Sequence, residues 1–184
     1  SAGPAPLPAS ASPAASAAPG APPTRRSRRR PAAAARNTLW CHLYLDRRML
    51  RRGFDLNKKI IGHGGEHTKG IYRDTGAKIR LRGQGSGHIE ASTGMEAPAP
   101  LMLAITGDSR LEDNFREAVR RSAELLATVG RRWAEWSEDA VPGATFWVGE
   151  LSPEAAACLT DTLYDLGLAL PPATAGEVWE PAAP

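Results

Sequence analysis

The sequence has few aromatic residues, only two cysteines and no long hydrophobic run. Phe, Trp and Tyr make up 6% of the 184 residues, and this low content argues against strands that serve as a platform for base stacking. Cys41 and Cys158 lie far apart and outside any Cys/His cluster. That arrangement argues against a disulfide framework and a structural zinc site, and it favours a reducing, intracellular compartment. No segment has the hydrophobic pattern of a membrane span or a secretory signal.

The first 36 residues also lack the side chains that build a core. Residues 1–36 are almost entirely Ala, Pro, Ser and Gly, followed by Arg. They bury too little apolar surface to offset the entropy lost when a backbone becomes ordered, so we expect a disordered tail. Its cluster of arginines at 25–30 is typical of nuclear-localisation signals and of arms that bind nucleic acid.

The net charge of +3 conceals two oppositely charged regions. Residues 25–82 contain seventeen Lys or Arg and four Asp or Glu, a balance of +13. Residues 83–184 contain six basic and sixteen acidic residues, a balance of −10. Positive charge that gathers in one part of a chain favours a polyanionic partner, and it therefore favours nucleic acid.

Apolar residues follow strand and helix periods along the central region. Residues 39–45 alternate between apolar and other side chains, which predicts a half-buried strand. Residues 57–61 and 66–75 predict two short helices that are joined through glycines. Residues 77–82 predict a second strand, residues 83–100 a long loop, and residues 101–105 a third strand. Helical spacing over residues 111–129 predicts a long amphipathic helix, with Asp108 or Ser109 as its cap.

This order of elements predicts an α+β fold in which a three-stranded antiparallel sheet packs on three helices. We expect a tail at residues 1–36, a domain at residues 37–130 and an acidic extension at residues 131–184. Within the extension, Phe146-Trp147-Val148 favours a strand, and residues 153–166 favour a helix with Pro153 in its first turn. The sequence leaves open whether this extension packs on the domain or contacts a protein partner.

One motif is more specific than these patterns. Ile60-Ile61-Gly62-His63-Gly64-Gly65 is followed by Thr75-Gly76-Ala77 and by Ile79. This order and spacing resembles the signature of KH domains, which is I-I-G-x-x-G, a helix and T-G-A-x-I. Residues 82–90, R-G-Q-G-S-G-H-I-E, resemble the variable loop of eukaryotic type I KH proteins linked to splicing, relatives of the branchpoint-binding and STAR proteins. The resemblance extends from Trp40 to Val129.

The residue types of the glycine loop suit a phosphate ligand. Gly62, Gly64 and Gly65 have no Cβ, so a phosphate can approach their main-chain N–H groups, and the next helix presents its N-terminal dipole. The resemblance implies that about four nucleotides of single-stranded RNA lie along this loop with their bases in an apolar groove. The RNA-binding residues that we expect are Leu56, Lys58, Lys59, Ile60, Ile61, Gly62, His63, Gly64, Gly65, Lys69, Ile79, Arg80 and Arg82.

These features predict a non-enzymatic RNA-binding protein that needs no cofactor or metal and acts in pre-mRNA processing or splicing, in the nucleus or alternatively in the cytoplasm. One alternative is a KH scaffold that binds proteins and not RNA. Another is a zinc-dependent hydrolase, because His63 to His67 match the H-x-x-E-H motif of inverted zinc peptidases. Two consecutive glycines disfavour the continuous helix that would bring both histidines to one metal ion.

Overall fold

The computed structural model describes residues 38–138 and 143–170. The predicted tail at residues 1–36, with its arginine cluster, lies outside the described residues. The elements, in chain order, are β1 (Thr38–Leu45), the 3-10 turn η2 (Arg47–Met49), α1 (Leu56–Ile61), the 3-10 turn η3 (His63–Gly65), α2 (Glu66–Thr75), β2 (Lys78–Arg82), β3 (Met102–Asp108), α3 (Glu112–Trp136), β4 (Phe146–Leu151) and α4 (Pro153–Asp165). None of these helices is long and apolar enough to cross a membrane.

The strands form one antiparallel sheet in the order β2-β3-β1-β4. The predicted α+β architecture is confirmed, but the sheet has four strands where the sequence predicted three. The additional strand, β4, pairs with the edge of β1 that β3 leaves free, with Leu43 opposite Val148 and Tyr44 opposite Trp147. A strand edge exposes unpaired N–H and C=O groups, so the pairing satisfies groups that would otherwise require water.

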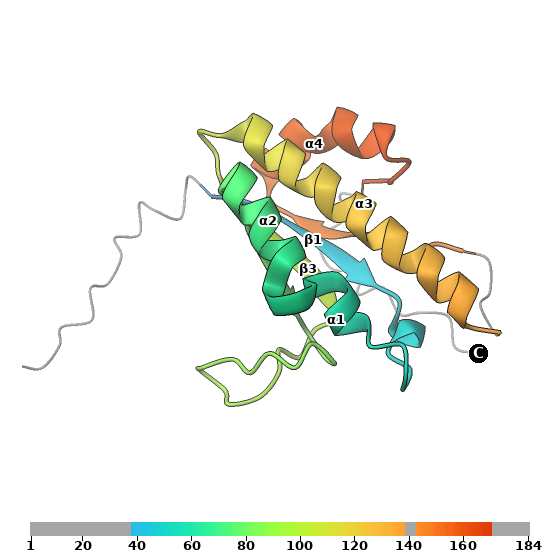
Figure 1. Cartoon of the computed structure of the whole chain (residues 1–184). Coiled ribbons are helices and arrows are strands. Elements are labelled where there is room, and N and C mark those ends of the chain that lie inside the picture. Colours follow the sequence, from blue (N-terminus) through green and yellow to red (C-terminus); the bar gives the residue numbers. More distant parts are fainter. Residues whose placement is uncertain (1–37, 139–142, 171–184) are drawn as a thin grey trace, which may run out of the picture. The chain divides into compact units, whose positions relative to one another are not determined.

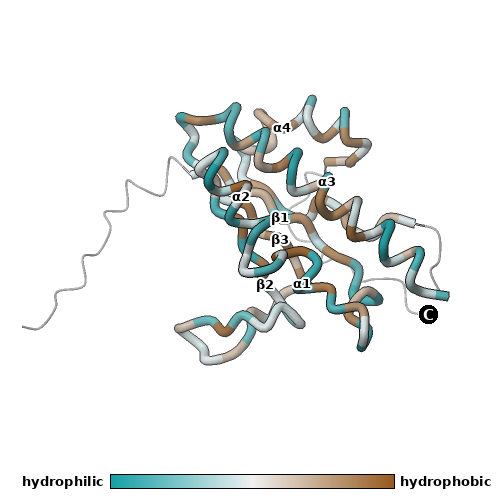
Figure 2. Tube along the Cα trace, viewed as in Figure 1, coloured by the Kyte–Doolittle hydropathy of each residue, from teal (hydrophilic) through white to brown (hydrophobic). Residues whose placement is uncertain are grey.

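One face of the sheet packs on the helices (Figure 1). The burial of β1 alternates residue by residue, and Leu39, Cys41, Leu43 and Leu45 are each at most 1% exposed. Ile79 of β2 and Ile105 of β3 lie opposite each other in the register and belong to the same core. Figure 2 shows hydrophobic residues along β1 between helices that alternate hydrophobic and hydrophilic positions. This alternation is what a two-layer core requires.

The described part of the C-terminal extension packs on the domain, which is one of the two possibilities that the sequence left open. Helix α3 continues to Trp136, and α4 contacts both α3 and β1. Ala155, Leu159 and Leu163 of α4 are fully buried in the common core. Pro153 stands in the first turn as predicted, and the Ser152 hydroxyl accepts a hydrogen bond from the Ala155 N–H at 3.2 Å.

One local expectation, the cap of α3, was wrong. Neither Asp108 nor Ser109 caps α3, because Leu111 stands at the N-cap and the Asp108 carboxylate instead accepts bonds from Arg110. Although aromatic residues are few, Trp40 and Tyr44 alternate along β1 and are only half-buried, on the face turned away from the core. A low overall content does not prevent aromatic residues from gathering on one strand.

Candidate nucleic-acid interface

The glycine loop at residues 62–65 connects α1 to α2 in a backbone conformation that favours glycine. The φ angles of Gly62, Gly64 and Gly65 are +80°, +59° and +85°, in the region that a Cβ disfavours. A Cβ at Gly62 would come within 3.0 Å of the His67 ring and main chain, whereas one at Gly64 would meet no atom within 4 Å. Gly64 is therefore the position at which the loop is open to its surroundings, as a backbone phosphate requires.

Two features make this loop attractive to an anion. Gly65 is the N-cap of the ten-residue helix α2 and has no side chain to cap it, so the positive end of the helix dipole lies at the loop. The Lys69 ammonium is exposed and donates a hydrogen bond to the Gly64 carbonyl at 2.7 Å. This bond holds the ammonium charge against the loop, and no ion pair among the described residues neutralises it.

The other two predicted lysines lie on α1 and have partners of their own. Lys58 is 3.3 Å from the Asp55 carboxylate in an exposed ion pair. The Lys59 ammonium lies 5.1 Å from the centre of the Phe54 ring, a cation–π arrangement that leaves its charge in place. An exposed ion pair of this kind is weak and readily exchanged, so Lys58 remains available to a phosphate.

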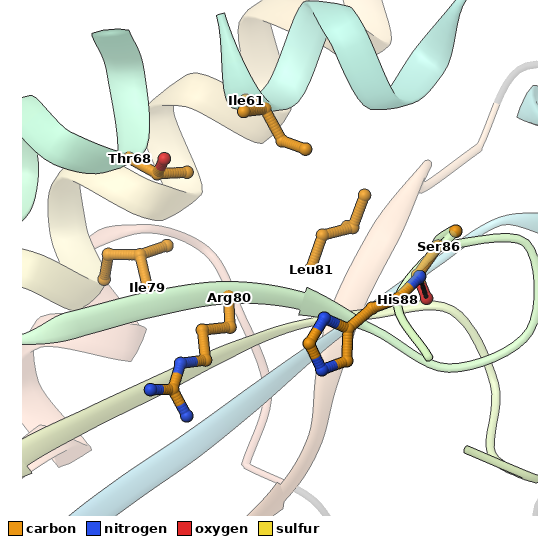
Figure 3. Close-up of a pocket in the computed structure, with 8 residues that line it drawn as sticks. Ile61, Thr68, Ile79, Arg80, Leu81, Ser86 and His88 are labelled. Carbon is orange, nitrogen blue, oxygen red and sulfur yellow. Dashed lines mark hydrogen bonds between the residues drawn. The ribbon is translucent and has the colours of Figure 1, made fainter. Parts of the chain in front are cut away.

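An open groove of about 410 Å³ begins beside the loop. Its lining comes from α1, α2, β2 and the following loop, and the residues are Ile61, Thr68, Ile79, Arg80, Leu81, Ser86, Gly87 and His88. Figure 3 shows Ile61 and Leu81 pointing toward each other across this space, while Arg80 extends from β2 in the opposite direction, away from the helices. The groove is therefore apolar at its centre and polar along one rim.

The predicted residues are distributed between this groove and the core. Ile61, Ile79 and Arg80 line the groove, as the resemblance implied. Leu56 and Ile60 do not, because they are 3% and 0% exposed and lie in the core under α1. A six-residue helix with one face on the sheet buries the residues of that face, so only the adjacent Ile61 turns toward the groove.

Arg82 has a different environment from Arg80. Its guanidinium forms an ion pair with the Glu90 carboxylate, which belongs to the loop at residues 83–100. The hydrogen bond from Arg82 is the main cause that holds the pKa of Glu90 below its ordinary value. Arg80 is exposed and is in no ion pair within the described residues. Of the two predicted arginines, Arg80 lines the groove, whereas Arg82 is held by Glu90.

The loop at residues 83–100, which we call the variable loop, provides three of the groove residues that the sequence did not single out; the other two, Thr68 and Leu81, lie on α2 and β2. Its Ser86, Gly87 and His88 reach the groove because the loop is fastened at two points. The Asn57 amide donates to the carbonyls of Gly85 and Ser86 at 2.9 and 3.2 Å. The motif R-G-x-G-S-G marked this segment in the sequence. It did not show that the loop would reach the groove, because the loop is held there by Asn57, which lies 28 residues from Gly85 along the chain.

The second fastening lies within the loop. The Glu96 carboxylate accepts hydrogen bonds from the N–H groups of Gly85 and Gly87, at 2.8 and 2.5 Å. These bonds, that of Gly85 first, hold the pKa of Glu96 below its usual range. Two loop amides, two residues apart and both directed at one carboxylate, form a small anion site that the protein fills itself. The wall of the groove is thus formed before any ligand arrives.

The zinc-peptidase pattern does not produce a metal site in the described residues. His63 lies in the turn η3 and His67 in α2, and the kink at Gly64 separates them. The His67 Nδ1 atom lies 3.3 Å from the Ile60 carbonyl oxygen, and its ring packs against Gly62. Within residues 38–138 and 143–170, no group of three His, Cys, Asp or Glu residues could hold a metal ion.

Comparisons with known proteins agree with this geometry. Residues 51–127 match the sequence model of the family described as KHDC4/BBP-like, KH-domain type I. An uncharacterized protein of Schizosaccharomyces pombe is 33% identical over 85 residues, which are 46% of this chain and 16% of that protein. Protein RIK of Arabidopsis thaliana is 34% identical over 71 residues, 39% of this chain and 12% of RIK. The chain therefore aligns with less than a fifth of each relative.

Proposed function

We propose, from the premise that residues 51–127 form a type I KH domain of the KHDC4/BBP-like group, that this chain binds single-stranded RNA in the groove between α1, α2 and β2. KH domains of this type are a non-enzymatic fold that binds nucleic acid. The observation that carries the proposal is the junction of the two parts of the site. The open, cationic glycine loop meets an apolar groove at the N-terminus of α2.

The two parts divide the work of recognition. The N–H groups and Lys69 at the glycine loop bind the RNA backbone, which fixes the path of about four nucleotides without reading their identity. The bases enter the groove, where Ile61, Ile79 and Leu81 replace water on their faces. Arg80, Ser86 and His88 lie on the rim and offer hydrogen-bonding groups to base edges. Specificity resides at this rim because the central residues are apolar.

We further propose a role in pre-mRNA processing or splicing within the nucleus. The support is the resemblance of the R-G-Q-G-S-G-H-I-E segment to splicing-linked KH proteins, together with the arginine cluster at residues 25–30. That cluster lies outside the described residues. Its expected contribution is affinity without sequence preference, because each phosphate that it neutralises releases counterions whatever the base.

The test is a fluorescence-anisotropy titration of the full chain and of a double variant, His63→Asp with Gly64→Asp, with labelled single-stranded RNA. Both positions are exposed and Gly64 is surrounded by open space, so the variant should fold. Its two carboxylates would meet the phosphates, and like charges in contact cost several kcal/mol, so we expect a loss of affinity of about a hundredfold or more.

The matched control is Thr93→Asp with Gly94→Asp. Gly94 also has a positive φ, of +67°, and open space around its Cβ position, but it lies at the exposed tip of the variable loop. The control should bind RNA nearly as well as the parent. If the glycine-loop variant bound RNA as tightly as this control, the glycine loop would not hold the RNA backbone. If the parent bound no RNA, a protein-interaction role for the KH scaffold would be favoured instead.

A further inference from the structure

The second face of the sheet, turned away from the core, has a composition that groove binding does not explain. On β1 the residues of this face are Trp40, His42 and Tyr44, which are half-buried and alternate with the core residues. On β2 they are the exposed Lys78 and Arg80. We call the surface formed by Lys78, Arg80, Ala104, Thr106, Trp40, His42 and Tyr44 the open face. In Figure 1 the helices lie on the other side of the strands.

The strand register orders these residues into rows that cross the sheet. Lys78 lies opposite Thr106, which lies opposite Trp40. In the next row, Arg80 lies opposite Ala104, which lies opposite His42. In these two rows cations occupy β2, small side chains occupy β3, and rings occupy β1. The row of Tyr44 differs, because it has the buried Met102 on β3 and Arg82, which is paired with Glu90, on β2. Neighbouring strands are about 4.8 Å apart, so the cations and rings flank a shallow strip about 10 Å wide.

The rings on this face are held in place by their neighbours. The Trp40 and His42 rings lie 4.9 Å apart between centroids, and the Tyr44 and Trp147 rings lie 6.2 Å apart in an edge-to-face arrangement. The Tyr44 ring also lies directly over Gly149, where a Cβ would be 2.3 Å from the ring. Rings that are already fixed lose little entropy when a flat ligand stacks on them.

Charge is distributed unequally across the open face. Lys78 and Arg80 are in no ion pair among the described residues, so the β2 side is positive. The Glu150 carboxylate lies beyond the rings, 3.7 Å from His42 and two-thirds exposed, and it makes the β4 side negative. An anionic ligand is thus attracted to β2 and repelled from β4. A ligand with a phosphate on one side and a flat base on the other matches this order.

We propose that the open face is a second binding surface for single-stranded nucleic acid, with phosphates toward Lys78 on the β2 side and bases stacked on Trp40 and Tyr44. The proposal goes beyond the groove and its four nucleotides. The two surfaces adjoin at β2, an edge strand of the sheet, and Arg80 belongs to both of them. A strand of RNA that leaves the groove across β2 arrives on the open face. Aromatic side chains beside a cationic path are the usual means of holding single strands.

The test compares two probe lengths, because a short strand fills the groove and only a longer one reaches the open face. Fluorescein-labelled oligo(A) and oligo(U) of four and twelve nucleotides are titrated against the full chain and against the double variant Trp40→Leu with Tyr44→Leu. Leucine keeps apolar bulk but cannot stack. We expect about a tenfold loss of affinity for the twelve-nucleotide probes, the scale of one stacked base, and unchanged affinity for the four-nucleotide probes.

Two controls accompany the variant. Tyr164→Leu removes an aromatic ring that is 84% exposed on α4, and it should bind both probe lengths like the parent. Trp40→Phe with Tyr44→Phe keeps the rings and should retain most of the affinity for twelve nucleotides. Longer probes also offer more registers to the groove, but this statistical gain is the same for parent and variant. It therefore cancels when the two are compared.

A second measurement does not depend on any variant. A twelve-nucleotide probe that carries 5-bromouridine is crosslinked to the unmodified chain by ultraviolet light, and the attached peptide is identified by mass spectrometry. A crosslink within residues 38–45 that the four-nucleotide probe does not give supports the proposal. The absence of such a crosslink overturns it.

The titrations separate this proposal from that for the groove. Failure of the parent to bind four nucleotides counts against the groove alone, whereas the effect of the leucine variant on twelve nucleotides judges the open face. No loss for the variant, or an equal loss at both lengths, overturns the proposal. Sedimentation that shows dimers of the parent and monomers of the leucine variant also overturns it, because the face would then be an interface between two copies.

Discussion

The glycine loop at residues 62–65 and the variable loop at residues 83–100 both border the groove, and both contain glycines with positive φ. They differ in what surrounds the glycines. Around Gly64 there is open space, and the Lys69 ammonium donates a hydrogen bond to the Gly64 carbonyl. A Cβ at Gly83 would lie 2.1 Å from the Pro100 carbonyl oxygen, and the amides of Gly85 and Gly87 already bind Glu96.

The same residue type therefore serves two purposes. In the glycine loop, the absence of a Cβ leaves room for a ligand that comes from outside. In the variable loop, it leaves room for the protein itself, because the two ends of the loop meet where β2 and β3 pair. The two loops also differ in negative charge. In the variable loop, Glu90 pairs with Arg82 and Glu96 accepts hydrogen bonds from the loop amides, so the loop supplies its own anions. The glycine loop is expected to control affinity, and the variable loop to control the shape of the groove.

The largest expected effect contrasts two glycine-to-alanine substitutions. Gly83→Ala places a Cβ against a backbone carbonyl at a φ of +88°, so we expect a loss of about 3 kcal/mol or more in the free energy of unfolding. Gly64→Ala introduces only the cost of positive φ, about 1 kcal/mol. Urea denaturation followed by circular dichroism measures both. Equal losses would remove the structural distinction between the two loops.

A second prediction concerns the two arginines of β2. Arg80→Ala should reduce discrimination between preferred and scrambled RNA by about 1–3 kcal/mol, by analogy with contacts to base edges in DNA, because Arg80 lines the groove and forms no ion pair with another described residue. Arg82→Ala should act through the variable loop, since its guanidinium is bound to Glu90. Anisotropy titrations with both RNAs, for each variant alone, provide the measurement.

Glu90→Gln is the matched partner for the Arg82 variant. If Arg82 acts through its ion pair, the two single variants should weaken binding similarly, and the double variant should add little further loss. Additive losses would instead place Arg82 in direct contact with RNA, as the resemblance first implied. Uniform weakening of both RNAs by Arg80→Ala would make Arg80 a backbone contact.

Much of the fold was predictable because its periodic signals are local. The alternation of Leu39 to Leu45, the glycine stop after Ile61 and the T-G-A-x-I sequence each specify a strand or a helix end within a few residues. The α+β arrangement followed from their order. The fourth strand was suspected from Phe146-Trp147-Val148, but its pairing with β1 is a contact between segments about a hundred residues apart. No local pattern records such a contact.

The residues of the candidate site also fall into two groups, those that a local motif places and those that depend on contacts between distant segments. The glycine loop, Ile61, Ile79 and Arg80 could be placed from the sequence, because the motif itself fixes their positions. The burial of Leu56 and Ile60 depends on how α1 rotates against the sheet, and the approach of Ser86 and His88 depends on Asn57 and Glu96. The aromatic residues of β1 were visible in the sequence. Their significance appeared only when the register placed Lys78 and Arg80 across from them.

The smallest expected effect tests the inner anion site of the variable loop. In Glu96→Gln the side chain keeps an oxygen that can accept a hydrogen bond but loses the charge that strengthens both bonds from Gly85 and Gly87. We expect a loss of RNA affinity of only a few-fold, on the order of one weakened hydrogen bond, because Ser86 and His88 would remain near the groove in a looser loop.

The pH dependence of the same bonds gives the sharper measurement. Because the folded protein lowers the pKa of Glu96 below the ordinary value of 4.5, the carboxylate stabilises the loop above that value, and this contribution is lost as the pH falls through the lowered pKa.

The amide resonances of Gly85 and Gly87, followed by NMR, should therefore stay constant near neutral pH and shift together below about pH 4.5. In Glu96→Gln this shared transition should be absent. Gly94 is the internal reference, since its N–H donates to the Glu90 main-chain carbonyl at 2.9 Å. A transition that persists in the variant would mean that another acid binds these amides. Glu96 would then not be the group that holds the variable loop at the groove.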